Sequence, residues 1–204
     1  MKVLLTGFGL FHDFSANPTE LLVQHFPELP NIMLKKLVFK VDFETVAQEY
    51  PTELTAFNPD LIINLGLNAT ANTIQLEEFA LNTAVPNQAI IVEHAPAAYR
   101  STLPLYALNK RLNQAGIPSQ VSQHAGTYLC NFIYYHSLHY MQQKEGAAVF
   151  MHLPFSSELV CQFALQNQRT YPSLPMATLQ NAIQLLIQDV EENLGTNTIK
   201  NASV

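Results

Sequence analysis

The sequence is poor in charged residues. Asp, Glu, Lys and Arg make up 13% of the 204 residues, about half of the usual fraction in globular domains. The ten basic residues are scattered and are outnumbered by sixteen acidic ones, so the net charge is −6. Because nucleic-acid binding needs a concentrated positive field, we expect no nucleic-acid partner. The low charge density agrees with a homo-oligomer, although Asn, Gln, Ser and Thr side chains can solvate a monomer equally well.

The sequence also lacks long hydrophobic runs and is poor in cysteine. No stretch approaches the roughly 20 apolar residues of a membrane-spanning helix, so we expect no membrane partner. The apolar start of the chain breaks at Thr6, and no signal-peptide cleavage site follows. We therefore expect a cytoplasmic protein. Its two cysteines, Cys130 and Cys161, have no metal-site spacing and are expected to be free thiols.

What the sequence does contain is a regular alternation of short apolar segments and amphipathic ones. This alternation predicts an α/β fold, a three-layer α/β/α sandwich with a mostly parallel central sheet. We expect a single domain over residues 1–195 and a polar tail over 196–204. The expected strands are 3–8, 32–41, 61–65, 74–82, 117–121 and 147–153, and the expected helices follow Asn17 or cover 43–57, 105–115, 127–143, 157–168 and 176–194.

Four residues mark helix boundaries or breaks. Asn17 is a typical N-cap and is followed by proline at the first helical position. Asp42 is expected to cap the second helix, which Pro51 should kink or split. Gly116 is a typical residue just beyond a helix C-terminus.

Cys130 stands just after a predicted strand and near the start of a predicted helix. The positive end of the helix dipole favours a thiolate there, and the free N–H groups of the first turn can bind an oxyanion. Functional sites of parallel sheets form beyond the carboxyl ends of the strands, which is where Cys130 would lie. Position alone leaves a second interpretation open, a buried cysteine on an apolar helix face.

Two further residue types complete a set for acyl transfer. His152 is the one polar residue near the end of an apolar strand, which suits a base at the rim of a sheet, although a structural histidine fits equally well. Glu77 and Glu78 are equal candidates for the carboxylate that would orient it. Nucleophile, base and orienting acid are the parts of nucleophilic catalysis.

Other chemistries have weaker support in the residues. His136 and His139 are three apart on a predicted helix, but they have no acidic or cysteine partner at a metal-site spacing. We expect them to be surface or interface residues and expect no metal. No dinucleotide loop or phosphate-binding loop is present, and no serine elbow surrounds Ser156 or Ser157.

At this point the sequence resembles the pyroglutamyl peptidase I family, also called pyrrolidone-carboxylate peptidases. Four blocks carry the resemblance, in the family's order and over nearly the whole chain. They are TGFGLF at 6–11 with NPTE at 17–20, EEFALN at 77–82, AGTYLCN at 125–131 and HLP at 152–154. The cysteine block is the most specific of them.

The resemblance implies a cysteine peptidase that removes N-terminal pyroglutamyl residues from peptides without a metal or cofactor. It places the nucleophile at Cys130, the base at His152 and the orienting carboxylate at Glu77 rather than Glu78. The family commonly forms tetramers. Cys161 has no family role and is expected to pack in the interior.

The resemblance also implies a pocket for the pyroglutamyl ring. Its expected lining residues, for which ordinary core packing is the alternative interpretation, are Phe8, Phe11, Leu67, Tyr128 and Leu129.

The sequence departs from the family's pattern around this pocket. Residues 10–13 lack two family glycines, and Leu67 stands where a glutamine faces the ligand. One family arginine is absent after Leu67, and another is absent from the shortened loop 83–87. These departures leave two alternatives, a divergent hydrolase of another small lactam or amide and a catalytically silent homologue that acts as a binding protein.

Overall fold

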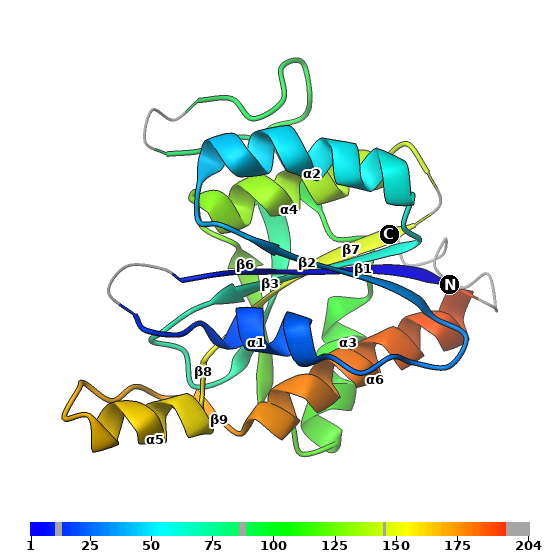
Figure 1. Cartoon of the computed structure of the whole chain (residues 1–204). Coiled ribbons are helices and arrows are strands. Elements are labelled where there is room, and N and C mark those ends of the chain that lie inside the picture. Colours follow the sequence, from blue (N-terminus) through cyan, green and yellow to red (C-terminus); the bar gives the residue numbers. More distant parts are fainter. Residues whose placement is uncertain (11–13, 86–88, 145, 195–204) are drawn as a thin grey trace.

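The computed structural model describes residues 1–10, 14–85, 89–144 and 146–194, and the expected boundary at 195 and the tail lie outside them. Strands and helices alternate as predicted (Figure 1). The elements are β1 (Lys2–Phe8), α1 (Pro18–His25), β2 (Met33–Phe39), α2 (Phe43–Phe57), β3 (Leu61–Leu67), β4 (Ile74–Leu81), β5 (Ala98–Arg100), α3 (Leu105–Gln114), β6 (Ser119–His124), α4 (Leu129–Met141), β7 (Ala147–Leu153), β8 (Phe155–Ser156), α5 (Ser157–Leu165), β9 (Ser173–Leu174) and α6 (Met176–Leu194). The short strands β5, β8 and β9 were not predicted.

The main sheet has the strand order β2-β1-β3-β7-β4-β5, and β6 pairs with β4. β2, β1, β3 and β7 are parallel to one another. Helices α2 and α4 cover one face, while α1, α3 and α6 cover the other (Figure 1). The prediction of a three-layer sandwich with a mostly parallel sheet is confirmed.

One part of the sheet departs from the parallel arrangement. β4 runs antiparallel to β7, and β6 runs parallel to β4. The carboxyl ends of all strands therefore do not meet at one edge. Glu77 lies in the middle of β4 rather than at a strand end, and only the pairing of β4 with β7 places it near the end of β7.

The central strands are apolar because both of their faces are covered by helices. Residues 3–5 of β1, 61–63 of β3 and 147–151 of β7 have no exposed surface. On the face under α2 and α4 the sheet contributes Leu4, Ile62, Ala148 and Phe150 to the core. The start of α4 packs on these buried strands.

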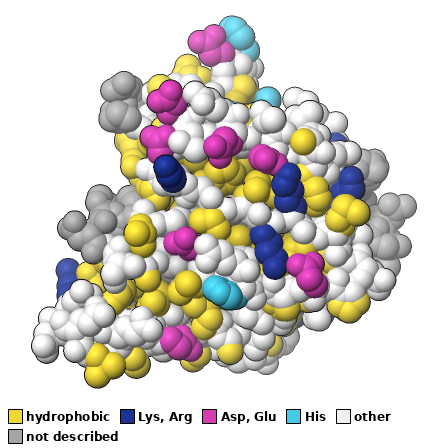
Figure 2. Space-filling model, in the orientation of Figure 1, with side chains coloured by type: hydrophobic (Ala, Val, Ile, Leu, Met, Phe, Trp, Pro, Cys, Tyr) yellow, Lys and Arg dark blue, Asp and Glu magenta, His cyan; other side chains and the backbone are white. Residues whose placement is uncertain are grey.

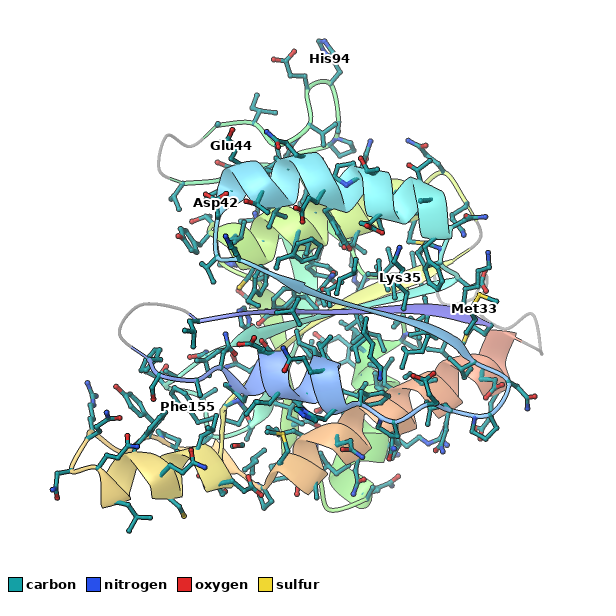
Figure 3. The ribbon with its side chains drawn as sticks, in the orientation of Figure 1. Met33, Lys35, Asp42, Glu44, His94 and Phe155 are labelled. Carbon is teal, nitrogen blue, oxygen red and sulfur yellow. The ribbon has the colours of Figure 1, made fainter. Side chains whose placement is uncertain are left out.

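The predicted helix caps are present. Asn17 Oδ1 accepts a hydrogen bond from Thr19 N at 3.0 Å, and Pro18 is the first residue of α1. Asp42, labelled at the start of α2 in Figure 3, accepts from Thr45 N at 2.7 Å. Hydrogen bonds from the side chain and backbone of Thr45 lower the pKa of Asp42.

Pro51 does not divide α2, which is one helix. A proline inside a helix leaves the carbonyl of the residue four positions earlier without its donor. That residue is Ala47, which is exposed, so solvent can satisfy its carbonyl group. Of the expected kink or split, the split does not occur, because the missing hydrogen bond lies on the solvent-exposed side of the helix. None of the helices in the described ranges has the length and apolar character needed to cross a membrane.

Candidate active site

Cys130 is the second residue of α4, and its side chain is half-buried. The helix begins without a side-chain cap, so the N–H groups of its first turn remain available. Beneath the thiol lies Gly66 of β3. A Cβ atom at this position would lie 3.1 Å from Cys130 Sγ and 2.6 Å from Phe150 Cζ. Glycine at position 66 therefore lets the thiol sit directly on the sheet.

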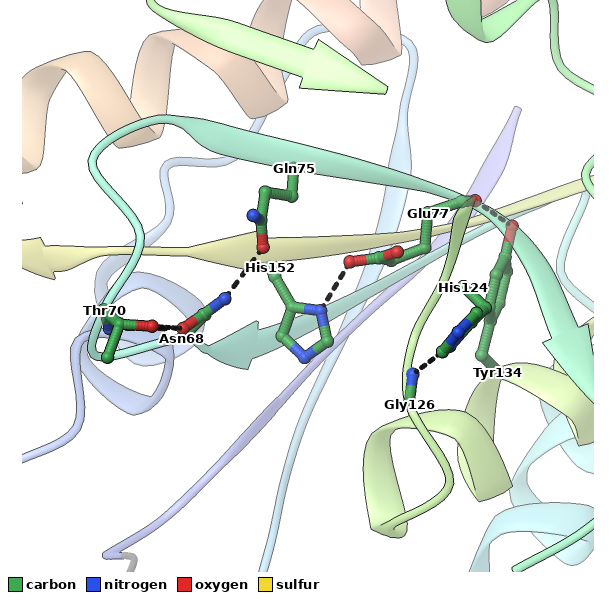
Figure 4. Close-up of polar contacts among 8 residues, drawn as sticks. All are labelled: Asn68, Thr70, Gln75, Glu77, His124, Gly126, Tyr134 and His152. Atoms are coloured by element: carbon green, nitrogen blue, oxygen red, sulfur yellow. Dashed lines mark hydrogen bonds and ion pairs between the residues drawn. The ribbon is translucent and has the colours of Figure 1, made fainter. Parts of the chain in front are cut away.

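His152 and Glu77 contact each other across the β4–β7 pairing. Phe150 is opposite Glu77 in the register, so Glu77 and His152 project from the same face of the sheet. His152 Nδ1 donates to Glu77 Oε1 at 2.7 Å (Figure 4). The Glu77 carboxylate is 1% exposed. A buried anion of this kind fixes both the orientation and the tautomer of the imidazole.

The imidazole of His152 also interacts with Cys130. Burial disfavours its protonated form, but the interaction with Cys130, followed by that with Glu77, outweighs burial and raises the pKa of His152 to about 9. The structure thus brings all three predicted catalytic residues into one chain of contacts. This arrangement suits a thiolate–imidazolium pair supported by a carboxylate.

Glu78 lies on the opposite face of β4. Its carboxylate pairs with Arg100 at 2.6 Å and accepts from the Tyr106 hydroxyl at 3.2 Å. It therefore faces away from His152. Of the two glutamates that the residues alone left equal, Glu77 is the one in contact with the histidine.

A pocket with an empty volume of about 340 Å³, counting its open mouth, adjoins Cys130. It lies where the β1–β3 ladder stops at Thr6 and Asn64 although both strands continue to Phe8 and Leu67. Four of its lining residues were predicted from the sequence in addition to Cys130, and two, Asn17 and Val41, were not. The lining residues are Phe8, Asn17, Val41, Leu67, Tyr128, Leu129 and Cys130. The predicted residue Phe11 lies outside the described residues.

The loop after Leu67, where the sequence departs from its family, is braced by Asn68. The Asn68 side chain donates to Gln75 Oε1 at 2.9 Å and accepts from Thr70 N at 3.1 Å (Figure 4). Gln75 is opposite His152 in the β4–β7 register. The loop is therefore fixed to β4, beside the strand that carries the histidine.

The two histidines that were considered as a metal pair, His136 and His139, contact aromatic side chains instead. His136 packs against Phe132, and burial, assisted by His139, lowers the pKa of His136 to about 4. His139 Nδ1 is 2.9 Å from the Tyr99 hydroxyl. In the described part of the chain, no three His, Cys, Asp or Glu residues could together hold a metal ion.

Both cysteines are free thiols, as predicted. Cys161, however, is exposed on α5. The expectation that it packs in the interior is wrong, because only Leu159 and Phe163 of this helix are buried.

The raised pKa of His152 predicts a dependence of stability on pH. The unfolded imidazole titrates near pH 6.5 and the folded one near pH 9. Protonation of His152 therefore stabilises the folded state fully below about pH 6.5, and this contribution is lost as the pH rises through about 9. We expect the free energy of unfolding, measured in urea, to fall over this interval. His152→Gln should flatten the fall, and an equal fall in both proteins would contradict this account.

Comparison with known proteins agrees with the geometry. The family model for pyroglutamyl peptidase matches residues 1–193. A pyrrolidone-carboxylate peptidase of Thermococcus litoralis is 36% identical over 203 residues, covering 92% of this chain and 91% of that protein. One from Halalkalibacterium halodurans is 33% identical over 202 residues, covering 92% and 98%.

Solved structures are similar over nearly the whole chain. The pyrrolidone carboxyl peptidase of Thermococcus litoralis superposes with a TM-score of 0.85 at 33% identity, covering 96% of each chain. A mutant pyrrolidone carboxyl peptidase of Pyrococcus furiosus superposes with a TM-score of 0.86 at 29% identity, covering 95% of this chain and 100% of the other. With its fold, its thiol–imidazole–carboxylate contacts and these relatives in agreement, the chain belongs to the pyroglutamyl peptidase family.

Proposed function

We propose that Cys130, His152 and Glu77 carry out the pyroglutamyl peptidase reaction in this chain, with pyroglutamyl peptides as substrates. By its family, the chain is a cysteine-type hydrolase of this class. The observation that carries the residue assignment is the continuous contact from Glu77 through His152 to Cys130, beside a pocket that includes the thiol.

In the first half of the proposed reaction, the Cys130 thiolate attacks the carbonyl carbon that joins the pyroglutamyl residue to the next residue. The carbonyl oxygen becomes an oxyanion, which the first-turn N–H groups of α4 stabilise. The C–N bond then breaks, and protonated His152 gives its proton to the leaving amine. The products of this half are a thioester on Cys130 and the shortened peptide.

In the second half, neutral His152 takes a proton from a water molecule that attacks the thioester carbon. The C–S bond breaks, pyroglutamate leaves, and the proton on His152 restores the ion pair with the thiolate. Glu77 holds the imidazole in place through Nδ1 in both halves. The proposed steps use no metal or cofactor.

The pocket suits a small, flat and neutral acyl group. Phe8 and Leu129 are buried in its wall, while Tyr128 is 42% exposed at the thiol. Apolar and aromatic walls of this kind bind a five-membered lactam by contact with its faces. Leu67, at the position where the family glutamine was expected, supplies an aliphatic wall. Despite this departure, we propose that the pyroglutamyl ring is the bound acyl group.

We further propose that the enzyme is a cytoplasmic homo-oligomer, with a tetramer as the first candidate. Its low charge density supports association, as do exposed apolar side chains such as Leu165, which is 85% exposed. Figure 2 shows hydrophobic side chains reaching the surface around α5. Light scattering would show a mass that is a multiple of 22.8 kDa, and a monomeric mass would contradict the proposal.

Hydrolysis of a pyroglutamyl-coumarin amide tests the proposed function. We expect fluorophore release from this substrate and none from the prolyl or glutaminyl amides, which lack the lactam carbonyl or the closed ring. Iodoacetamide should abolish the activity. Cleavage of another cyclic amide in preference would indicate a divergent hydrolase, and no turnover by folded, reduced protein would indicate a binding protein.

A further inference from the structure

Three polar side chains lie in a row on the buried face of α4. Asn131, Tyr134 and Ser137 are three residues apart, which places them one above another on a helix, and all three are fully buried. Buried polar groups destabilise a core unless each is hydrogen-bonded. Each of these three contacts the sheet, so the helix that carries Cys130 is held by directional bonds as well as by apolar packing.

Tyr134 contacts the sheet at the point that matters most for the site. Its hydroxyl donates to the main-chain oxygen of Glu77 at 2.9 Å (Figure 4). The hydroxyl of Tyr134 also interacts with the backbone of Phe150 and with the Ser101 side chain. Glu77 and Phe150 are partners in the β4–β7 register. One buried hydroxyl therefore contacts β4 at Glu77 and β7 at Phe150. Phe150 lies two residues before His152.

The other two members of the row hold the ends of the same stretch of helix. The side chain of Asn131, next to the nucleophile, accepts a hydrogen bond from Leu81 N at 2.7 Å. It donates to Leu81 O and to Thr83 O, each at 2.9 Å. Ser137 Oγ lies 2.7 Å from Asn64 Oδ1 of β3. These contacts tie α4 to the end of β4 on one side and to the centre of the sheet on the other.

Hydrogen bonds can fix what apolar packing leaves loose. Apolar contact is non-directional, so a helix resting on Phe150 and Ile62 alone could slide by a fraction of an ångström. A misplacement of about 1 Å can cost about a hundredfold in rate. Cys130 is on α4 and His152 is on β7, so the distance between their side chains depends on where α4 lies on the sheet. The hydrogen bonds from α4 to β4 and β7 fix that position.

We propose that Tyr134 is a positioning residue for the reaction, and that its hydroxyl sets the contact between Cys130 and His152 by holding α4 against the Glu77–Phe150 pair. The proposal rests on the proposed function of Cys130 and His152. Tyr134 itself does not contact the reacting atoms. It acts through the strands that carry the carboxylate and the imidazole.

The chain supplies a matched control in the next residue. Tyr135 is also fully buried, and its hydroxyl donates to a main-chain oxygen, that of Pro96, at 2.5 Å. Pro96 belongs to the loop before β5 and not to β4 or β7. Tyr134→Phe and Tyr135→Phe therefore delete the same group, with the same kind of acceptor, from the same helix.

The experiment compares these variants in a Cys161→Ser background, so that Cys130 is the only thiol. It measures kcat and KM on the pyroglutamyl-coumarin amide, the rate of Cys130 alkylation by iodoacetamide as a function of pH, and the urea midpoint. For Tyr134→Phe we expect kcat to fall about tenfold with KM within about twofold, and the alkylation curve to move to higher pH. For Tyr135→Phe we expect a comparable change in the urea midpoint, with kcat and the alkylation curve unchanged.

Either of two results would overturn the proposal. One is unchanged kcat and alkylation in Tyr134→Phe, and the other is equal losses in both tyrosine variants. Ser137→Ala provides a second test at the next point of the row, with the same expected direction. Because the alkylation curve does not depend on turnover, it tests positioning even if the wild type fails to cleave the amide, a failure that would count only against the proposed function.

Discussion

Replacing Cys130 with alanine is expected to lower kcat for the pyroglutamyl-coumarin amide by at least about a thousandfold. The thioester needs the sulfur atom, and Cys130 is the nucleophile that interacts with His152. The side chain is half-buried and rests on Gly66, so its loss leaves a small space and should preserve the fold. Steady-state rates with the urea midpoint measure the two effects separately.

Cys161→Ala is the matched control for this prediction. It removes a thiol from the exposed side of α5, away from the pocket-lining residues, and should leave kcat within about twofold of the wild type. Activity that survives Cys130→Ala, or that is lost in Cys161→Ala, would be incompatible with the assignment of the nucleophile.

Exchange of Glu77 for glutamine is expected to lower kcat by about 10²- to 10⁴-fold. The amide has nearly the same size and keeps an oxygen that can accept from His152 Nδ1, but the negative charge that favours the imidazolium is lost. The resting ion pair should weaken and the proton for the leaving amine should be held less firmly. The pH dependence of kcat/KM, measured on the same amide, should lose its upper limb at a lower pH than in the wild type.

Glu78→Gln is the control for the carboxylate, because it makes the identical change one residue away. Glu78 contacts Arg100 and Tyr106 on the other side of the sheet, and glutamine keeps an oxygen that can accept from both, so this change should leave the contact between His152 and Glu77 intact. We expect kcat within about threefold of the wild type. Similar losses in both variants would mean that the charge of β4 as a whole, and not the contact with His152, supports the reaction.

Cys130 and His152 were accessible from the sequence because local patterns mark them. A strand end and a helix start are written in a few consecutive residues, and the AGTYLCN block is specific. The direction of β4 was not accessible, since antiparallel pairing with β7 joins segments that are about 75 residues apart, as in the Glu77–His152 contact. Which of two adjacent glutamates faces the histidine depends on that pairing alone.

The pocket shows the same limit. Phe8, Leu67, Tyr128 and Leu129 were expected from the family's motifs, and the structure places them around one space. Asn17 and Val41 were missed because the space opens where β1 and β3 separate beyond Thr6 and Asn64, a property of the sheet and of no single segment. The row on α4 was hidden for a similar reason, since its partners lie on strands far away in the chain.

The ion pair of Glu78 has a consequence for how the chain folds. Two carboxylates in succession make β4 ambiguous, since a slip of one residue against β7 would turn Glu78 toward His152 and Glu77 away from it. Arg100 and Tyr106 contact Glu78 on its own side of the sheet, and such a slip would separate Glu78 from both. A contact remote from the thiol thus favours the strand alignment that presents Glu77, and not Glu78, to His152.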